Sequence, residues 1–214
     1  MKLIGMLDSP YVRRVAISLE LLGVPFEHEA VSVFSTFERF QFLNPVVKAP
    51  TLITDDGTVL MDSSLILQYV EATLTEGRTL WSANATARLA QFRAVGLALA
   101  ACEKSVQLVY ERQLRPAAAQ HEPWVKRVTG QLLAAYAALE AEVQHQQALF
   151  QDTHSQSTVS AAVAWQFTQS MLAREVEASR HPGLQALSAR IEPLSCFLKF
   201  PPTGPGVPAS GREA

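Results

Sequence analysis

Asn44 to Ser64 reads NPVVKAPTLITDDGTVLMDSS, and it is the most informative segment of the sequence. It contains two β-rich segments separated by Asp56-Gly57, a pair that is typical of tight β-hairpin turns. Pro50 stands at the entrance of the first segment, where a residue without an N–H group is tolerated. If the bond before Pro50 is cis, the backbone of Ala49 is turned outward and can pair with an extended ligand. The stretch therefore predicts a hairpin whose entrance can bind a ligand of peptide size.

The end of the same stretch predicts the start of a helix. Asp62-Ser63-Ser64 immediately precedes an apolar run that continues to about Thr73. Aspartate and serine side chains accept the unpaired N–H groups of a first helical turn, so we expect a helix to begin here. The N–H groups at such a helix start also attract carboxylates. A charged ligand of peptide size is therefore the expected ligand of this corner.

The residues before this stretch alternate between strand and helix patterns. Ser9 and Pro10 are the expected N-cap and first residue of one helix, and Ser35 and Glu38 have the Ser-x-x-Glu form of a capping box that opens another. The expected elements are a strand at 3–6, a helix at 10–22, a strand at 26–33 and a short helix ending near 43. With the hairpin and its helix, the order β-α-β-α-β-β-α over residues 1–75 predicts a small α/β layer domain.

The rest of the chain reads as helical. Thr75–Ser82 is polar and contains a glycine, and it is the expected linker. The expected long helices cover about 86–114, 123–147 and 157–180, and a shorter helix begins at 184 and is ended by Pro193. We therefore predict an all-helical domain at residues 83–200. Residues 201–214 are rich in proline, glycine and serine, and this composition predicts a disordered tail.

Composition excludes several classes of function. The 214 residues carry 18 basic and 20 acidic side chains, a net charge of -2, which indicates neither nucleic acid nor a membrane surface as partner. No apolar run approaches the length of a signal segment or a membrane span. Cys102 and Cys196 are far apart, as expected of a reduced, cytoplasmic protein. The five histidines lack the spacing of metal ligands, so no metal is expected.

Three motifs, in this order and spacing, resemble those of the soluble glutathione transferase family in its bacterial-like, serine-type form. They are SPYVRRV from Ser9 to Val15, Asn44-Pro45 followed by Lys48-Ala49-Pro50, and Asp62-Ser63. The resemblance implies a thioredoxin-like βαβαββα domain that binds glutathione, followed by an all-helical domain that contributes the pocket for an electrophile. It covers the N-terminal domain closely and the helical domain by architecture and position only.

The chain departs from the family's pattern at three places. Ala49 replaces the usual valine before the proline, which matters little because only its backbone is used. Val47 stands where the family often has glycine, and we expect it to stiffen or reshape the loop. The third long helix keeps Ser157 as the first partner of a Ser/Thr-x-x-Asp cap but has Ser160 in place of the acid, which predicts a weaker cap.

By this resemblance Ser9 is the predicted catalytic residue. Its hydroxyl would donate a hydrogen bond to the sulfur of glutathione, at a helix start that also favours a thiolate. From the residues alone, a plain helix cap is the favoured role of Ser9, because any serine before a proline at a helix start would fill it. Tyr11 is the second candidate, because many family members use a tyrosine near this position, and its alternative role is that of a surface aromatic. Arg13 and Arg14 are expected to be solvated or paired with acids, and the alternative is that one of them lies near the glutathione site.

Glutathione itself is expected to be bound by Lys48, Ala49, Pro50, Asp62 and Ser63. The Asp62 carboxylate suits the γ-glutamyl ammonium, and the Ser63 hydroxyl with the helix N–H groups suits the γ-glutamyl carboxylate. Lys48 would meet the glycyl carboxylate, and the backbone at Ala49-Pro50 would meet the cysteinyl residue. The alternatives are ordinary helix caps at residues 62 and 63 and an ordinary exposed lysine at residue 48.

The resemblance implies a glutathione transferase that activates the glutathione thiol for attack on a small hydrophobic electrophile. Glutathione would be a co-substrate, with no permanently bound cofactor. A glutathione-dependent isomerase is a lower-ranked alternative, because Ser9 stands alone where such enzymes usually have a Ser-Ser-Cys-Ser cluster. A non-catalytic binding or regulatory protein is the alternative from another class, and the intact set of glutathione-binding residues argues against it. The family also implies a homodimer, with no nucleic acid or membrane partner.

Overall fold

The computed structural model describes residues 1–207, which divide into two compact units. The first unit comprises Met1–Leu80 and Leu194–Gly206, and the second comprises Trp81–Pro193 with Val207. The division at Leu80 falls inside the predicted linker. The helical unit ends at Pro193 rather than at the predicted residue 200, because the segment that follows packs with the N-terminal residues.

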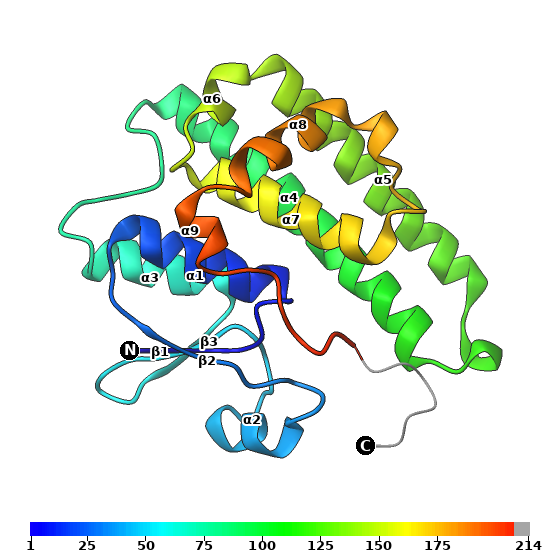
Figure 1. Cartoon of the computed structure of the whole chain (residues 1–214), viewed down its shortest axis with the longest axis horizontal. Coiled ribbons are helices and arrows are strands. Elements are labelled where there is room, and N and C mark those ends of the chain that lie inside the picture. Colours follow the sequence, from blue (N-terminus) through cyan, green and yellow to red (C-terminus); the bar gives the residue numbers. More distant parts are fainter. Residues whose placement is uncertain (208–214) are drawn as a thin grey trace. The chain divides into compact units, whose positions relative to one another are not determined.

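The first unit is built on a four-stranded mixed sheet with the strand order β2-β1-β3-β4 (Figure 1). Its strands are β1 (Lys2–Ile4), β2 (Glu27–Glu29), β3 (Thr51–Ile53) and β4 (Val59–Met61). β1 runs parallel to β2 and antiparallel to β3, and β3 and β4 form the hairpin that Asp56-Gly57 predicts. Gly57 has a φ of 85°, which explains why the turn needs a glycine.

Helices cover both faces of this sheet (Figure 1). α1 (Pro10–Leu22) and α3 (Ser63–Thr73) pack against each other on one face, and α2 (Phe37–Leu43) lies on the other. Leu3 and Leu52 are paired in the sheet and are both fully buried. Ile4 points to the opposite face, because side chains alternate along a strand, and it packs in a cluster with Phe40 of α2. The expected α/β layer arrangement with a thioredoxin-like βαβαββα order is confirmed.

The ends of the first two helices agree only in part with the sequence. Ser9 is the N-cap of α1, and Gly23 ends it in the left-handed conformation, with a φ of 67°. The capping box predicted for α2 is wrong, because the N-cap is Thr36 rather than Ser35. The Thr36 hydroxyl bonds the backbone of Ser32 instead of the first turn of α2, accepting from its N–H and donating to its carbonyl.

The second unit is entirely helical. Its helices are α4 (Ala85–Leu114), α5 (Glu122–His145), α6 (Gln147–Gln151), α7 (Gln156–Leu172) and α8 (Pro182–Ile191), with 3-10 turns at η1 (Ala117–Ala119) and η2 (Ala178–Arg180). α4 packs along α5 and α7, and the α7 side chains are mostly buried. Within residues 1–207, no helix combines the length and the apolar character that crossing a bilayer requires.

α7 begins and ends at other residues than the sequence predicts. Its N-cap is Ser155, whose Oγ accepts the N–H of Thr158 at 3.2 Å, so the cap predicted at Ser157 is misplaced. The cap serine is fully buried. α7 ends at Leu172 instead of continuing to residue 180, and only the turn η2 follows. The predicted weakness of the cap is therefore based on the wrong serine.

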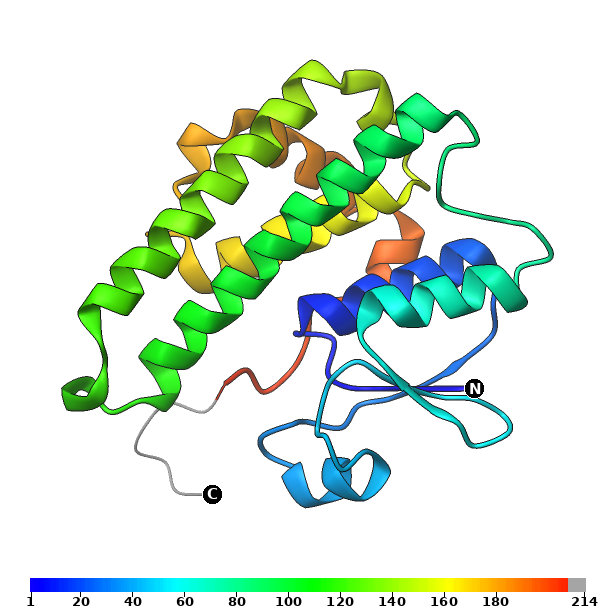
Figure 2. The ribbon, with the colours of Figure 1, turned by 180° about the vertical axis from the view of Figure 1, so that it is seen from behind.

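The C-terminal segment returns to the first unit (Figure 2). α9 (Ser195–Leu198) packs against α1, and the chain then runs past the beginning of that helix. The prediction of a disordered tail is wrong for residues 201–206, because their backbone groups have partners in the N-terminal residues. The carbonyl of Thr203 accepts the N–H of Asp8 at 3.1 Å. Residues 208–214 of the predicted tail lie outside the described residues.

Candidate functional site

The sheet register brings three of the predicted groups to one end of the sheet. Ile4 is the last residue of β1 and pairs with Thr51, which in turn pairs with Met61 on its other side. The loop that leads to α1 therefore leaves the sheet beside Thr51. Pro50 immediately precedes Thr51, and Asp62 immediately follows Met61. The start of α1, the Ala49-Pro50 peptide and the start of α3 thus lie at the same end of the sheet.

A glycine allows the closest approach among these groups. Gly5 follows β1 with a φ of 139°, a conformation that favours glycine. A Cβ atom at this position would lie 2.6 Å from Cγ2 of Val12 and 3.3 Å from Cβ of Ala49. Because only glycine leaves room, the end of β1, the first turn of α1 and Ala49 pack directly against one another.

Ser9 occupies the N-cap position of α1, but its side chain makes no capping hydrogen bond. Its backbone is extended, with a φ of -73° and a ψ of 123°, and its N–H donates to the carbonyl of Met6 at 3.1 Å. The side chain is half-buried. The helix-cap interpretation therefore accounts for the backbone of Ser9 and leaves its hydroxyl outside the cap. Tyr11, the second candidate, is also half-buried in the first turn.

The loop before β3 is held by hydrogen bonds of Asn44. The Asn44 side chain is buried, donates from Nδ2 to Oγ1 of Thr51 at 2.8 Å, and accepts the N–H of Val46 at 3.0 Å. The Thr51 hydroxyl donates to the carbonyl of Lys48 at 2.7 Å. These bonds position the Ala49-Pro50 peptide, which is cis as the sequence suggests. Asn44 is part of a motif that resembles the family, but it was not predicted as a site residue. Its place before Pro45 is the sequence signal that could have indicated its role in this loop.

Lys48, Ala49 and Pro50 differ in exposure. Pro50 is buried, Ala49 is half-buried, and the Lys48 side chain is exposed. Val47 before them has a φ of 52°, in the left-handed region that a β-branched residue rarely adopts. Its side chain nevertheless packs against the cluster formed with Ile4. The substitution of valine for glycine thus changes the side-chain packing of this loop.

Asp62 caps α3. Its Oδ1 accepts the N–H groups of Ser64 at 2.9 Å and Leu65 at 3.3 Å, which confirms the helix-cap interpretation. Its backbone has a φ of 75° and a ψ of 123°, a combination that residues other than glycine seldom adopt. Both capping bonds use Oδ1, so Oδ2 takes no part in the cap. The carboxylate therefore keeps one oxygen outside the cap.

Arg13 and Arg14 are buried, so their predicted solvation is wrong. The Arg14 Nη1 donates to the hydroxyls of Ser63 at 3.0 Å and Ser64 at 3.1 Å, which ties α1 to the start of α3. Their exposed fractions are only 1% and 3%. Every residue from Val12 to Leu19 is buried, because the sheet, α3 and α9 surround this part of α1 and leave it no face exposed to solvent. Ser63 is therefore also buried, with its hydroxyl already accepting one hydrogen bond.

Asp8, the residue before Ser9, is a further ionisable group that the sequence did not single out. Its Oδ2 accepts the N–H of Gly206 at 2.9 Å. Burial raises the pKa of the Asp8 carboxyl above its ordinary value, although the hydrogen bonds from Gly206 and Ser9 oppose that shift. The carboxylate lies on the N-terminal side of α1, where it is bound to the returning C-terminal segment.

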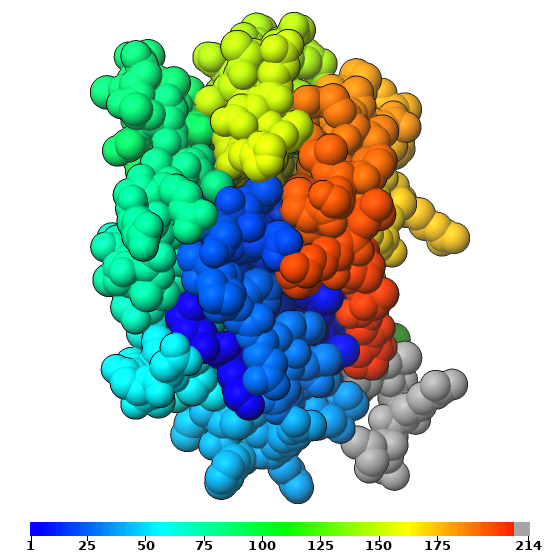
Figure 3. All heavy atoms as spheres, turned by 60° about the vertical axis from the view of Figure 1, so that its left-hand side comes forward, coloured from blue at the N-terminus to red at the C-terminus, as the bar shows by residue number. Residues whose placement is uncertain are grey.

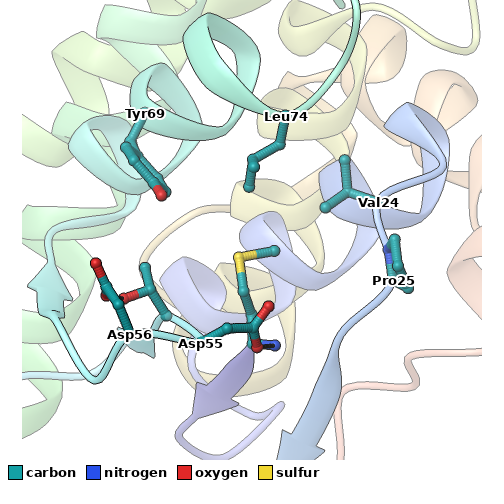
Figure 4. Close-up of a pocket in the computed structure, with 8 residues that line it drawn as sticks. Val24, Pro25, Asp55, Asp56, Tyr69 and Leu74 are labelled. Carbon is teal, nitrogen blue, oxygen red and sulfur yellow. Dashed lines mark hydrogen bonds and ion pairs between the residues drawn. The ribbon is translucent and has the colours of Figure 1, made fainter.

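A hollow of about 380 Å³ opens at the other end of the sheet (Figure 4). Asp55 and Asp56 of the hairpin face it from one side, and Tyr69 and Leu74 face it from the other. Met1, which immediately precedes β1, completes the lining at this end with Val24, Pro25 and Thr54. None of the predicted site residues lines this hollow. Within residues 1–207, no group of three or more histidine, cysteine, aspartate or glutamate side chains could hold a metal ion.

The family comparison agrees with this geometry. Residues 3–76 match the family model described as "Glutathione S-transferase, N-terminal domain". These residues are a glutathione S-transferase N-terminal domain. Curated relatives match the same region: glutathione S-transferase U3 of Arabidopsis thaliana is 41% identical over 76 residues, which are 35% of this chain and 33% of the relative. The uncharacterized GST-like protein YibF of Escherichia coli is 35% identical over 71 residues, which are 33% of this chain and 35% of the relative.

Solved structures extend the likeness to the helical unit. A glutathione transferase family member from Pseudomonas fluorescens with bound glutathione has a TM-score of 0.81 and 26% identity, covering 95% of this chain and 99% of the other. A glutathione S-transferase from Methylobacterium radiotolerans, in complex with glutathione sulfonate, has a TM-score of 0.82 and 24% identity over 100% of this chain and 97% of the other, which shows the fold. The N-terminal domain therefore belongs to the glutathione S-transferase family, and the whole chain has the fold of solved glutathione transferases. The match spans about a third of the length of the curated relatives.

Proposed function

We propose that this protein is a transferase that activates the thiol of glutathione for attack on a small hydrophobic electrophile. The observation that carries the proposal is the register Ile4–Thr51–Met61, which gathers the start of α1, the cis Ala49-Pro50 peptide and the start of α3 at one end of the sheet. Two helix starts and an outward backbone are complementary to a short peptide with a carboxylate and a thiol. The P. fluorescens relative is described with glutathione bound.

Ser9 is the proposed catalytic residue. Its hydroxyl is not used to cap α1, so it can donate a hydrogen bond to the glutathione sulfur. The N–H groups and dipole of the first turn favour the thiolate over the thiol, and each unit by which the thiol pKa falls corresponds to about 1.4 kcal/mol. The thiol proton leaves to solvent, and the thiolate forms a carbon–sulfur bond with the electrophile. An aryl halide then loses halide, an epoxide opens by breaking a carbon–oxygen bond, and an enone becomes an enolate. The alkoxide or enolate takes a proton from solvent.

The remaining predicted residues bind glutathione in this proposal. The backbone of Ala49 before cis Pro50 pairs with the cysteinyl residue. At α3, the Asp62 oxygen that takes no part in the cap meets the γ-glutamyl ammonium. The Ser63 hydroxyl, with the first-turn N–H that Asp62 does not cap, meets the γ-glutamyl carboxylate. Lys48 is exposed beside this peptide and is available to the glycyl carboxylate. Tyr11 remains the alternative hydroxyl donor if Ser9 is dispensable.

The test is a conjugation assay on the full chain with glutathione and a panel of aryl halides, epoxides and enones. We expect turnover with at least one electrophile, and we expect Ser9→Ala to lose at least about 90% of the rate while still binding glutathione, as is typical when one hydrogen bond to a developing anion is removed. Tyr11→Phe is the matched control for loss of a nearby hydroxyl and should retain its rate. Full turnover by Ser9→Ala would contradict the role of Ser9.

Calorimetry with glutathione separates the proposed enzyme from the other functions. Absence of any binding heat at millimolar glutathione would favour a non-catalytic protein of the same fold. Isomerisation of a substrate without net consumption of glutathione would favour the isomerase. We also propose a homodimer, as the family implies, and sedimentation showing only monomer would exclude it.

A further inference from the structure

The C-terminal segment is tied to the residue that precedes Ser9. The Gly206 N–H donates to Oδ2 of Asp8 at 2.9 Å, and the Asp8 N–H donates to the carbonyl of Thr203 at 3.1 Å. The two bonds join the same two stretches of chain in opposite directions, so they fix both the main chain and the side chain of Asp8. Figure 3 shows the same proximity on the surface, where dark-blue atoms of the first residues lie beside red atoms of the C-terminal segment.

A second tie lies one turn further along α1. The Arg13 Nε donates to the carbonyl of Phe200 at 2.8 Å, and its guanidinium carbon lies 5.4 Å from the ring centroid of Phe197. Arg13 is 1% exposed, and such a buried arginine depends on the partners it has. The returning segment therefore holds the chain on both sides of Ser9, at the residue before it and at the first full turn after it.

The close approach at Asp8 depends on a glycine. A Cβ atom on Gly204 would lie 2.0 Å from Oδ2 and 2.2 Å from Cγ of Asp8. A side chain at residue 204 would therefore force the Asp8 carboxylate, which accepts the N–H of Gly206, to move. An alanine at residue 204 would therefore separate the two stretches without changing any charge.

We propose that residues 200–206 form a strap that holds the loop carrying Ser9 in its catalytic position, with Asp8 and Gly204 as positioning residues. The inference rests on the proposed function, because the Ser9 hydroxyl is the group that is positioned. That hydroxyl has no capping bond of its own, so its place follows from the backbone around it. A displacement of about 1 Å in a group that aligns a reacting atom can lower a rate about 100-fold.

The first test compares two glycine-to-alanine variants of the full chain. Gly204→Ala should lower kcat about 10- to 100-fold and change the KM for glutathione less than about threefold, because the proposed binding groups at 49–50 and 62–63 belong to other elements. Gly130→Ala on α5 is the matched control, since a Cβ there meets nothing within 4 Å. It should keep the wild-type kcat.

The second test compares Asp8→Ala with Asp8→Asn, which carry the same charge. Alanine removes the acceptor for the Gly206 N–H, whereas asparagine keeps one through its amide oxygen. We expect Asp8→Ala to lower kcat as Gly204→Ala does. We also expect it to raise the pKa of the thiol of bound glutathione, which is measured from the ultraviolet difference spectrum of the thiolate. The asparagine variant should restore both toward wild type. A role in folding alone would change stability and leave the thiol titration unmoved.

The outcomes distinguish the strap from the function on which it rests. If Ser9→Ala is inactive but Gly204→Ala and Asp8→Ala keep the wild-type kcat per folded molecule, the strap is refuted and the proposed function stands. If Ser9→Ala keeps its full rate, both fail. If Gly204→Ala does not fold, the pair of Asp8 variants decides, because equal rates in the two would overturn the proposal.

Discussion

Two residues near the proposed glutathione site hold backbone conformations that side chains rarely adopt. Val47 has a φ of 52° and Asp62 a φ of 75°. Such conformations persist only where the surroundings hold them, and they are concentrated at functional sites. Val47 is held by packing of its side chain, and Asp62 by the two N–H groups that it caps. Each residue therefore combines an unfavourable backbone conformation with a favourable side-chain contact. Substitutions can measure the two contributions to stability separately.

An alanine variant is usually more stable than a glycine variant, and at Val47 we expect the opposite order of stability. Val47→Ala removes packing and keeps a left-handed backbone that costs about 1–2 kcal/mol in a residue with a Cβ. Val47→Gly removes the same packing but also removes that cost. Urea denaturation should therefore show the glycine variant to be at least as stable as the alanine variant. A glycine variant that is less stable by the ordinary margin of about 0.5–1 kcal/mol would contradict the strain at this residue.

At Asp62 the two proposed roles can be measured separately. Asp62→Asn keeps a good N-cap but removes the charge, so thermal stability should change little while the dissociation constant for glutathione rises about tenfold or more. Asp62→Ala should lose the same affinity and, in addition, about 1 kcal/mol of stability. The measurements are calorimetric titration with glutathione and thermal unfolding. Equal affinity in Asp62→Asn and wild type would exclude an ion pair with the ligand.

Among the helices, the residues at the N-terminus have different roles in the two units. The Ser9 hydroxyl does not cap α1, whereas Asp62 caps α3 and Ser155 caps α7. The starts of α1 and α3 lie at one end of the sheet and are joined by Arg14, which donates to Ser63. The start of α7 is buried in the helical unit, where its cap serves packing. The same kind of helix start thus lies at the proposed glutathione site in one unit and caps a buried helix in the other.

The cap of α7 gives a direct comparison between sequence and structure. Ser155→Ala should destabilise the protein by about 1–2 kcal/mol, because it leaves the buried N–H of Thr158 without its acceptor. Ser157→Ala should cost less than half as much, since its hydroxyl contacts only that of Ser155 among its described partners. Chemical denaturation of both variants checks this. A larger loss of stability in Ser157→Ala than in Ser155→Ala would show that Ser157 is the cap, as the sequence predicts.

At the scale of the whole molecule, the two units are interleaved along the chain. The chain leaves the first unit after Leu80, builds the helical unit, and returns at Leu194. The return places the two ends of the described chain together, with Gly206 bonded to Asp8. The first unit is therefore completed only after the second has been synthesised.

This closure predicts how stability depends on pH. Burial raises the pKa of Asp8 above the ordinary 3.8, so the folded state holds its proton to higher pH than the unfolded state. Stability from this group is thus full below 3.8 and is lost as pH rises through the raised pKa. Asp8→Asn has no ionisable group at this position and lacks that loss. Its stability relative to wild type should therefore increase as pH rises from 3.8 through the raised pKa of Asp8, and then stay level.

A second aspartate provides a control of opposite sign. Hydrogen bonds from Thr54 and Thr58 lower the pKa of Asp56, so its contribution is present above 3.8 and is lost as pH falls through the lowered value. Asp56→Asn should therefore lose stability relative to wild type as pH rises. Denaturant titrations of both variants between pH 2 and 6 test the two signs, because the Asp56 effect lies below 3.8 and the Asp8 effect above it. The same sign in both variants would show that burial does not dominate at Asp8.

The elements of the first unit and the position of the Ala49-Pro50 peptide follow from the sequence alone. Local chemistry is enough for these: Asp56-Gly57 requires a turn, Pro10 and Gly23 bound a helix, and Pro50 admits a cis bond at a strand entrance. Such signals act over a few residues, so they can be recognised without knowledge of what packs against them. The sequence also indicated the candidate residues from 48 to 63 by their resemblance to a family.

Only the tertiary structure decided which of those side chains are buried, paired or free to act. Arg13 and Arg14 look like surface residues until α9 and α3 cover α1, and residues 201–206 look disordered until they meet Asp8. These contacts join residues up to 198 positions apart, and no local pattern encodes them. The physical reason is that burial and hydrogen bonding depend on the partner as much as on the residue. The strap over the start of α1 is therefore a property of the fold.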